Sequence, residues 1–572
     1  MHRSGVNNRN ALPYLCRGLG PLGPGVVSIR EIHGPCVVWL SVAILLSSAN
    51  SLWAAQSPGQ LTVRIVDLQG QALPCRAWVE VVGERLFRPS APEVCTPYPR
   101  DRSFSCDGNF TIDLPAAQAL VHVERGKEYR PVNRSIDMGA DREKAITITL
   151  QRWINMPAEG WYSGDLHVHL GADDPQVLRQ LALADDVHVT PAFTYWLRGR
   201  ESQWPSTWPP FGEGEPWVID ATHLITRTAV EIERIQRNAI PGGSVGASFL
   251  FNLTRPLSAD RVGEHFPTDA ALCLAARRHS PEVVIDTDKP SWAETVVGAA
   301  LGAYDTVQVC HNHYHRDQTL SGGWGMIGPL APGESNAAPG DGLFHRTNAL
   351  YYRLLNCGFR LGVSGGSAIG VMPVPMGYSR VYAQVEGTLT AEKFWAALKS
   401  GLSFATSGPM LTMTADRQPL GSTLERRSAD QSPISVDVRV RSIDRLEALQ
   451  LVHNGLVVES IDLSKGQPTP VLDRSVTWRI PAKRSGWIAA RSLFRAPDGL
   501  LRQAHTSPIY ITVDDQPIAN RDDARYMMRW IDRLIDIAHR PDRFPEEADR
   551  QGVLETYGQA RAVYQRIAGE VR

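Results

Sequence analysis

The chain has 572 residues, which is too long for one ordinary domain, because domains commonly hold about 100 to 200 residues. We therefore expect three or four structural units. The 59 lysines and arginines nearly balance the 60 aspartates and glutamates, so the overall charge gives no sign of a nucleic-acid partner or of an anionic membrane surface.

Residues 1–55 have the pattern of a leader that directs export. An apolar stretch at 37–46 follows two basic positions and precedes a run of small residues, as in a secretory signal peptide. The stretch is too short to span a bilayer comfortably, and the proline, glycine and serine around it argue against a buried core segment. We expect an exported protein, periplasmic or extracellular, whose membrane contact would be limited to an uncleaved leader.

The eight cysteines are scattered, and no two form a CxxC pair, which argues against a structural zinc knuckle. Cys75, Cys95 and Cys106 fall close together after the leader. In an oxidising compartment two of these three could form a disulfide. The sequence leaves the pairing open, and unpaired buried cysteines explain the pattern equally well.

Residues 56–152 predict a small β-sandwich. Apolar and polar residues alternate with a period of two at 61–66 and 77–82, with a turn between them, and this alternation is typical of half-buried strands. Further short runs of this kind lie at 110–112, 120–123 and 145–150. Short strands separated by turns favour a sandwich, and the segment resembles carboxypeptidase-regulatory-like domains, most of all at 124–129.

From 153 to 410, strand-like runs alternate with helical patterns, as expected of α/β architecture. Asp174 before Pro175 predicts a helix start, with the aspartate capping the first turn. Another helix is predicted at 391–400. The predicted strands lie at 187–192, 229–235, 283–286, 306–310 and 360–364.

Beyond Gly408 and Pro409 the pattern returns to β. Strand-like runs predict a second β-sandwich over 411–515. They lie at 434–440, 446–452, 475–480, 486–490 and 509–513. Residues 516–572 contain two charge-rich helical stretches, which predict a helical tail.

The strongest chemical signal is the alternation of Asp165, His167 and His169. Side chains in a strand repeat every second residue, so a strand here would place the carboxylate and both imidazoles on one face. Imidazole suits zinc, iron and other divalent transition metals, and a neighbouring carboxylate can ligate the ion or orient a histidine. The segment therefore predicts a metal site, against the alternative of two polar histidines on an exposed strand.

Glu231 and Glu233 are the second candidate pair. Apolar and acidic residues alternate over 230–234, so both carboxylates share a face. We expect one of them to be a metal ligand, with Glu233 the first choice and Glu231 the second. The alternative is the solvated face of an amphipathic strand.

Histidines also alternate after the strand predicted at 306–310. His313 is the best ligand candidate among them, while His311 would bind substrate or backbone. Upstream, Asp286 and Lys289 end another predicted strand. Asp286 is a further ligand candidate and Lys289 could stabilise a developing anion, although an ordinary surface turn explains both.

The segments that carry these candidate ligands follow one another along the chain in an order that resembles that of the polymerase and histidinol phosphatase superfamily of metal-dependent hydrolases. Within the superfamily, the chain resembles the carbaryl-hydrolase-type branch most. The resemblance runs from 161–169 through the strand of Glu231 and the pair Asn312 and His313 to 404–409. It implies a distorted seven-stranded β/α barrel in the α/β segment, with metals bound at the carboxyl ends of its strands. It also implies hydrolysis of phosphate esters or of carbamate, ester or amide bonds.

Two places depart from the superfamily pattern. Residues 193–196 stand where the pattern has an aspartate and histidine pair, and Ser367 stands where it has a late aspartate ligand. These departures predict fewer bound ions than in a full multi-metal site.

A metal-dependent hydrolase is therefore the first hypothesis, on a barrel flanked by two sandwiches and followed by the helical tail. A divalent ion of zinc, manganese or iron, or more than one, would activate water to attack a small-molecule substrate. The ligand candidates are His167, His169, Glu233, Glu231, His313 and Asp286. Asp165 would orient a ligand or accept the proton. The candidates for contact with substrate are Lys289, His311, Arg198 and Arg316.

Two other hypotheses stand beside it. A barrel without turnover could serve as an exported binding module between the two sandwiches, and Ser367 favours this. An amidohydrolase barrel also opens with two alternate histidines, but it needs a final aspartate where this chain has Gly366 and Ser367.

Overall fold

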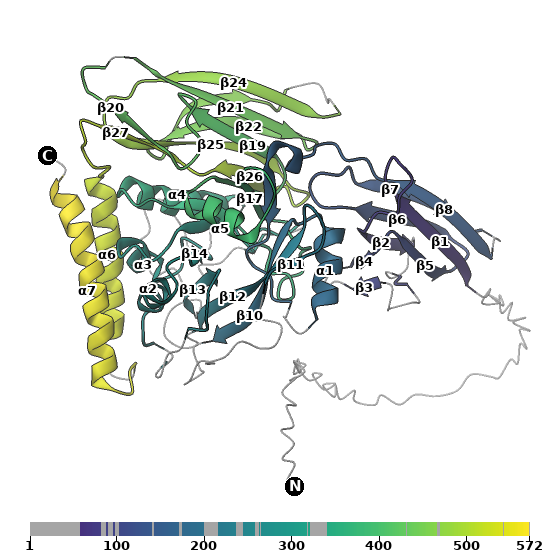
Figure 1. Ribbon diagram of the computed structural model, residues 1–572, viewed down its shortest axis with the longest axis horizontal. Coiled ribbons are helices and arrows are strands. Elements are labelled where there is room, and N and C mark those ends of the chain that lie inside the picture. Colours follow the sequence, from purple (N-terminus) through teal and green to yellow (C-terminus); the bar gives the residue numbers. More distant parts are fainter. Residues whose placement is uncertain are drawn as a thin grey trace, which may run out of the picture. The chain divides into compact units, whose positions relative to one another are not determined.

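The computed structural model describes residues 58–570, except for 82–86, 90–94, 98–101, 140–141, 171–173, 199–214, 236–243, 258–261, 263–264, 317–318, 321–339, 431, 466–469 and 541–542. This part of the chain is a multidomain, mixed α/β protein with several sheets (Figure 1). The predicted leader at 1–55 lies outside the described residues. None of the described helices is long and apolar enough to cross a membrane.

Two sheets built from 59–149 share one hydrophobic core. One has the order β5 (Asn109–Leu114), β1 (Gly59–Val66), β8 (Glu143–Thr149). The other has the order β3 (Cys95–Pro97), β4 (Phe104–Cys106), β2 (Cys75–Val81), β6 (Gln118–Glu124), β7 (Val132–Asp137). Leu61 and Val63 of β1 are buried while Thr62 and Arg64 are exposed, so the predicted alternation is confirmed.

Cys75 and Cys106 lie opposite each other on β2 and β4, with their Sγ atoms 3.6 Å apart. Both side chains are buried. The side chain of Cys95 lies outside the described residues. Of the three cysteines considered for a disulfide, the structure therefore places Cys75 and Cys106 side by side.

The α/β part is built on a long mixed sheet. Its strands follow the order β16, β15, β14, β13, β12, β10, β9, β17. Their bounds are β9 (Trp161–Gly164), β10 (Val189–Arg198), β12 (Leu224–Ile235), β13 (Ser244–Phe251), β14 (Val284–Thr287), β15 (Thr306–Cys310), β16 (Gly362–Gly365) and β17 (Arg380–Gln384). The strands β9, β10 and β12 are parallel, as are β14, β15 and β16, while β13 is antiparallel to both its neighbours. The short β11 (Trp217–Val218) pairs with β12.

Helices connect most of these strands. Their bounds are α1 (Pro175–Ala184), α2 (Asp269–His279), α3 (Thr295–Ala300), α4 (Gly342–Asn356) and α5 (Ala391–Lys399), and a 3-10 turn, η1 (Pro157–Glu159), precedes β9. Helix α1 begins as predicted, because the Asp174 side chain accepts a hydrogen bond from Val177 N at 3.1 Å. It follows β9 and the segment that carries the alternating histidines.

The two ends of the α/β sheet approach each other. Leu166 N, just after β9, donates to Gly365 O of β16 at 3.1 Å. Ser403 Oγ of β18 (Ser403–Thr406), which pairs with β17, donates to Val363 O of β16 at 3.0 Å. The described strands therefore curl toward closure, although their backbone ladders do not complete a ring.

Strand β18 carries the main sheet into the C-terminal part. The order continues with β26 (Leu501–Thr506), β25 (Gly486–Arg495), β22 (Leu446–His453) and β23 (Leu456–Asp462). A separate sheet of β19 (Met410–Ala415), β21 (Ile434–Ser442) and β24 (Leu472–Ile480) shares a hydrophobic core with it. Strand β20 (Thr423–Arg426) pairs with β27 (Ile509–Val513). The main sheet thus crosses the boundary predicted near residue 410.

The C-terminal helices α6 (Arg521–Ala538) and α7 (Glu547–Glu570) pack together and against the α/β part (Figure 1). Trp530 Nε1 donates to Ala293 O at 3.0 Å, and the Tyr564 hydroxyl donates to Val296 O at 2.8 Å. Both aromatic side chains are buried in the hydrophobic cluster that covers one face of the α/β sheet. The predicted helical tail is therefore part of this core.

Trp530→Ala should lower the free energy of unfolding by about 3 to 5 kcal/mol, because it leaves a cavity and an unpartnered carbonyl in this core. Denaturant titration followed by circular dichroism measures the change. Arg525→Ala, at an exposed position of the same helix, is the control and should stay within about 0.5 kcal/mol of the parent. Equal stability of the two variants would contradict the docking of α6.

Candidate metal centre

The segment 165–169 does not continue β9. The strand ends at Gly164, and Asp165 Oδ1 accepts a hydrogen bond from His167 N at 3.0 Å, which closes a side-chain turn. The prediction that Asp165, His167 and His169 share one strand face is therefore wrong. The histidines point toward each other, while the aspartate contacts the loop after β16.

The Asp165 carboxylate is saturated by hydrogen bonds. Oδ1 accepts from the N–H groups of His167 and Ser367, at 3.0 and 2.9 Å, and Oδ2 accepts from Gly377 N at 2.7 Å and from the Ser367 hydroxyl. These four donors match the acceptor sites of one carboxylate. Burial raises the pKa of Asp165 in spite of them. Asp165 thus joins the loops after β9 and β16, and the structure gives it no contact with the histidine rings.

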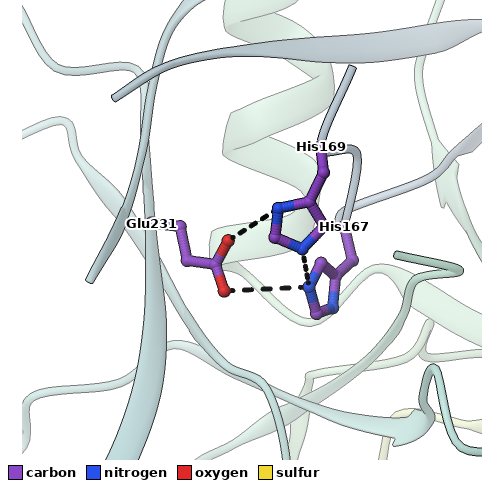
Figure 2. A group of neighbouring side chains, drawn as sticks. All are labelled: His167, His169 and Glu231. Atoms are coloured by element: carbon purple, nitrogen blue, oxygen red, sulfur yellow. Dashed lines mark hydrogen bonds and ion pairs between the residues drawn. The ribbon is translucent and has the colours of Figure 1, made fainter. Parts of the chain in front are cut away.

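His167, His169 and Glu231 form a compact group with the donors of a metal site (Figure 2). The Nε2 atoms of the two histidines are 2.8 Å apart. The Glu231 carboxylate faces both rings, with Oε1 3.8 Å from His167 Nε2 and Oε2 3.4 Å from His169 Nδ1. His167 and Glu231 are buried and His169 is half-buried, so the group is largely shielded from bulk water.

Asp288 orients the His167 ring. Its Oδ1 lies 3.3 Å from His167 Nδ1, a contact that favours the tautomer with the proton on Nδ1 and the Nε2 lone pair toward His169 and Glu231. Burial alone would raise the pKa of Asp288, but the Lys289 ammonium and His167 outweigh it and hold the pKa well below its usual range. The carboxylate is therefore charged, as this orienting role requires.

Asp286, the ligand predicted on β14, faces the neighbouring strands instead. Its carboxylate accepts hydrogen bonds from Thr306 Oγ1 at 2.6 Å, from Gln308 Nε2 at 2.8 Å and from the Ser364 hydroxyl. Burial raises the pKa of Asp286 to about 7 in spite of these bonds. Asp288 takes the place beside the histidines. It was missed as a candidate, although its spacing from Asp286 repeats the alternation of the histidines.

The Lys289 ammonium is buried between the Asp288 carboxylate and the ring of Trp292, whose centroid is 4.7 Å away. It offsets the charge of the aspartate that orients the first histidine. The positive charge of Lys289 also acts on His311 and His313, which follow β15. Burial, followed by repulsion from Lys289, holds the pKa values of His311 and His313 well below their usual range, so both imidazoles are neutral.

His311 has both ring nitrogens engaged by protein groups. Its Nδ1 accepts from His313 N at 3.3 Å, so Nε2 carries the proton, 3.1 Å from Thr347 Oγ1. This imidazole has no lone pair left for a cation. His313 is buried beside it, with ring centroids 5.4 Å apart, and is not one of the three residues grouped around His167.

The structure reverses the expected order of the two glutamates. Glu231 rather than Glu233 belongs to the group with His167 and His169. Both residues lie on β12, but Glu231 pairs with Phe249 of β13 and Glu233 pairs with Ala247. Glu233 is half-buried. About 7 Å of strand length separates the two positions, which is enough to move one carboxylate away from the histidines.

Arg316 was predicted to contact substrate at the metal site, but it pairs with Glu124 instead. Its Nη2 is 2.7 Å from Glu124 Oε2, and its guanidinium lies over the ring of Trp78. Arg198 is the last residue of β10, and its side chain lies outside the described residues.

Two phenylalanines form an apolar wall beside the group. The ring centroid of Phe249 is 4.6 Å from that of His167, and the centroid of Phe193 is 6.2 Å from that of His169. Both phenylalanines are buried. Phe193 begins the segment 193–196, and here it supplies an apolar surface beside the histidines.

A second buried group also has the composition of a metal site. It consists of Asp186, His188 and His223. The His188 Nδ1 atom accepts from Ser163 N at 2.9 Å, so its other nitrogen carries the proton and has no lone pair for a cation. Asp186 is already paired with Arg125 at 3.0 Å and with Arg152 at 3.1 Å. These guanidinium charges oppose a cation, so the group is better described as an ion-pair network.

The His167 group, in contrast, suits a divalent cation. Its two Nε2 atoms converge, and one carboxylate supplies negative charge beside them. Imidazole and carboxylate donors together fit zinc, manganese or iron.

Glu231→Gln should weaken zinc binding by about 10- to 100-fold, because the amide removes the one negative charge of the group. Glu233→Gln should leave zinc affinity unchanged. Competition with a chromophoric chelator measures both dissociation constants. A larger effect of Glu233→Gln would restore the order that the sequence predicts.

Asp288→Asn should also weaken zinc binding by about 10- to 100-fold, since the amide no longer fixes the proton on His167 Nδ1. The matched control is Asp286→Asn, two residues away, which should lower thermal stability and leave zinc affinity unchanged. Equal zinc affinities of the two variants would refute the orienting role of Asp288.

Comparisons with protein-family models, with curated proteins and with solved structures found no match. Membership of the polymerase and histidinol phosphatase superfamily therefore stays a prediction from the sequence, and the function follows from the site.

Proposed function

We propose that this chain is a metal-dependent hydrolase that cleaves an ester, carbamate, amide or phosphoester bond in a small molecule. The observation that carries the proposal is the convergence of His167 Nε2, His169 Nε2 and the Glu231 carboxylate beside a charged Asp288. A zinc, manganese or iron ion bound there would lower the pKa of a water ligand and polarise the scissile bond.

The chain's own residues have separate tasks in this proposal. Asp288 keeps the proton of His167 on Nδ1, so that Nε2 remains a donor to the cation. Lys289 balances the charge of Asp288 and places a positive potential near the substrate, where negative charge develops. Phe193 and Phe249 exclude water from one side of the site. Asp165 positions His167 through its backbone and takes no proton.

We expect one tightly held ion rather than several. Phe193 and Ser367 stand at positions where the superfamily pattern has ligands, and Asp286 accepts hydrogen bonds from the neighbouring strands. His311 has no free lone pair. Each of these residues removes a donor that a second ion would need.

The proposal extends to the fold. We infer that the α/β part is a distorted β/α barrel of the polymerase and histidinol phosphatase type, between two β-sandwich domains. Parallel strands joined by helices support this, as does the approach of β16 to β9 and β18. The first sandwich would be of the carboxypeptidase-regulatory-like kind.

We also propose that the protein is exported. The signal-peptide pattern at 37–46 is the main support. In an oxidising compartment Cys75 and Cys106, whose Sγ atoms are 3.6 Å apart, could form a disulfide.

An exported metal-binding module without turnover is the second candidate. The Ser367 hydroxyl donates to Asp165, so the position that holds a late acidic ligand in the superfamily instead fixes a loop. Under this candidate the ion would still bind the His167 group, with the chain serving as a scaffold.

His167→Ala should lose the bound metal and reduce turnover of ester, carbamate or phosphodiester substrates by about 100-fold or more. The exposed His345→Ala is the control and should retain both. Elemental analysis and a substrate panel are run on the same preparations, before and after chelation and addition of zinc, manganese or iron. Bound metal with no hydrolysis across the panel would favour the binding module, and unchanged hydrolysis in His167→Ala would refute the proposed site.

A further inference from the structure

A cavity of about 460 Å³ lies apart from the metal group. Its wall includes Lys127, which follows β6, Arg380 at the start of β17 and Ser407, which follows β18. The exposed Asp444 lies on its rim. His167, His169 and Glu231 do not line it, so an occupant would not touch the metal ligands.

Part of the charge on the wall is balanced within the wall. Arg76 contacts Glu124 through Nη2, and its Nε lies 3.2 Å from Asp185 Oδ1. Arg316 also pairs with Glu124, 2.7 Å from Oε2. Two guanidinium groups therefore face two carboxylates, and this part of the wall is neutral.

Lys127 and Arg380 add two further cations. Within the described part of the chain neither forms an ion pair with a carboxylate. The Lys127 ammonium donates to Ser407 O at 2.7 Å and lies 4.2 Å from the ring centroid of Tyr378. The buried Arg380 guanidinium donates to backbone oxygens and to the Ser163 hydroxyl. These contacts leave the Arg380 guanidinium and the protonated form of Lys127 without a negative counterpart at hydrogen-bond distance.

The surroundings of Lys127 favour an anion. Burial, followed by repulsion from Arg380, lowers the pKa of Lys127 to about 7. Arg316 opposes the ammonium further, while Asp444 and Glu124 favour it without restoring the usual pKa. An anion beside Lys127 would offset both the burial and the repulsion.

Arg495 also lines the cavity, and its charge is balanced outside the wall by Asp341 and Glu447. Much of the remaining wall is apolar, with the buried side chains of Tyr129, Met376, Tyr378 and Phe494. Its volume is in the range of small-molecule sites, and its aromatic side chains give an apolar surface that an aromatic ring can contact. Asp444 on the same wall offsets one of the two charges of Lys127 and Arg380, so the wall keeps about one net positive charge and favours an anion of a single charge. Together these features select one negative charge on an apolar body.

We propose that this cavity binds a small aromatic monocarboxylate, with its carboxylate beside Lys127 in the field of Arg380 and its ring among Tyr129, Tyr378 and Phe494. The site is independent of the metal group, and the proposal holds whether or not the chain is a hydrolase.

Isothermal titration of the full chain with benzoate tests the proposal, and benzamide serves as a neutral probe of the same shape. Benzoate should bind saturably with a dissociation constant of about 1 mM or tighter. Benzamide should bind about ten-fold more weakly or worse, because it cannot form a charged hydrogen bond with Lys127.

Two variants separate the charge effect from a folding defect. Lys127→Met should weaken benzoate binding by about ten-fold or more. Asp444→Asn removes a repulsive charge from the rim and lowers the pKa of Lys127 further, so the variant is compared with the parent at about pH 5.5, where Lys127 stays protonated. There it should tighten benzoate binding by about three-fold, a gain that a misfolded chain would not give. His167→Ala should leave benzoate binding unchanged. A failure of the cavity proposal can therefore be told apart from a failure of the hydrolase proposal.

Several outcomes would overturn the proposal. They are no saturable binding of benzoate, equal affinities for benzoate and benzamide, an unchanged affinity in Lys127→Met, or tighter binding of inorganic phosphate than of benzoate.

Discussion

The geometry of the site depends on one buried carboxylate, Asp165, which accepts four hydrogen bonds from the loops after β9 and β16. These bonds fix the backbone of His167 and bring β16 against the end of β9. They also fix Gly377, whose carbonyl oxygen accepts from Arg380 on the wall of the cavity. The metal group and the cavity are therefore held by two ends of the same loop. A carboxylate with this many donors is a structural anchor, which is why its position in the motif is a poor guide to its chemistry.

The buried histidines differ in whether the ring nitrogen that could bind a cation carries a proton. His188 and His311 accept a backbone N–H at Nδ1, so their remaining nitrogen carries a proton and cannot bind a cation. His167 has the carboxylate of Asp288 at Nδ1 instead, and its Nε2 lone pair is available. Composition alone makes the groups of His167 and His188 look alike. Hydrogen bonding distinguishes the candidate metal site from the ion-pair network.

Much of this arrangement could be predicted from alternation along the chain. The pattern indicated the strands of the first sheets, the cap at Asp174 and the pair of histidines. It failed where a strand ends, because Asp165 lies past β9 and its side chain closes a turn. It also could not rank Glu231 and Glu233, which share a strand and differ in their position along it. Strand β13 was not predicted, since the glycine and serine at its start hide a strand whose place depends on pairing with β12 and β14.

One cation should bind where the side chains of His167 and His169 converge. A crystal of the full chain soaked in zinc, with data collected at the zinc absorption edge, would show whether it does. We expect an anomalous peak within bonding distance of His167 Nε2 and His169 Nε2, with Glu231 beside it. A peak among Asp186, His188 and His223, or no peak at either group, would contradict it.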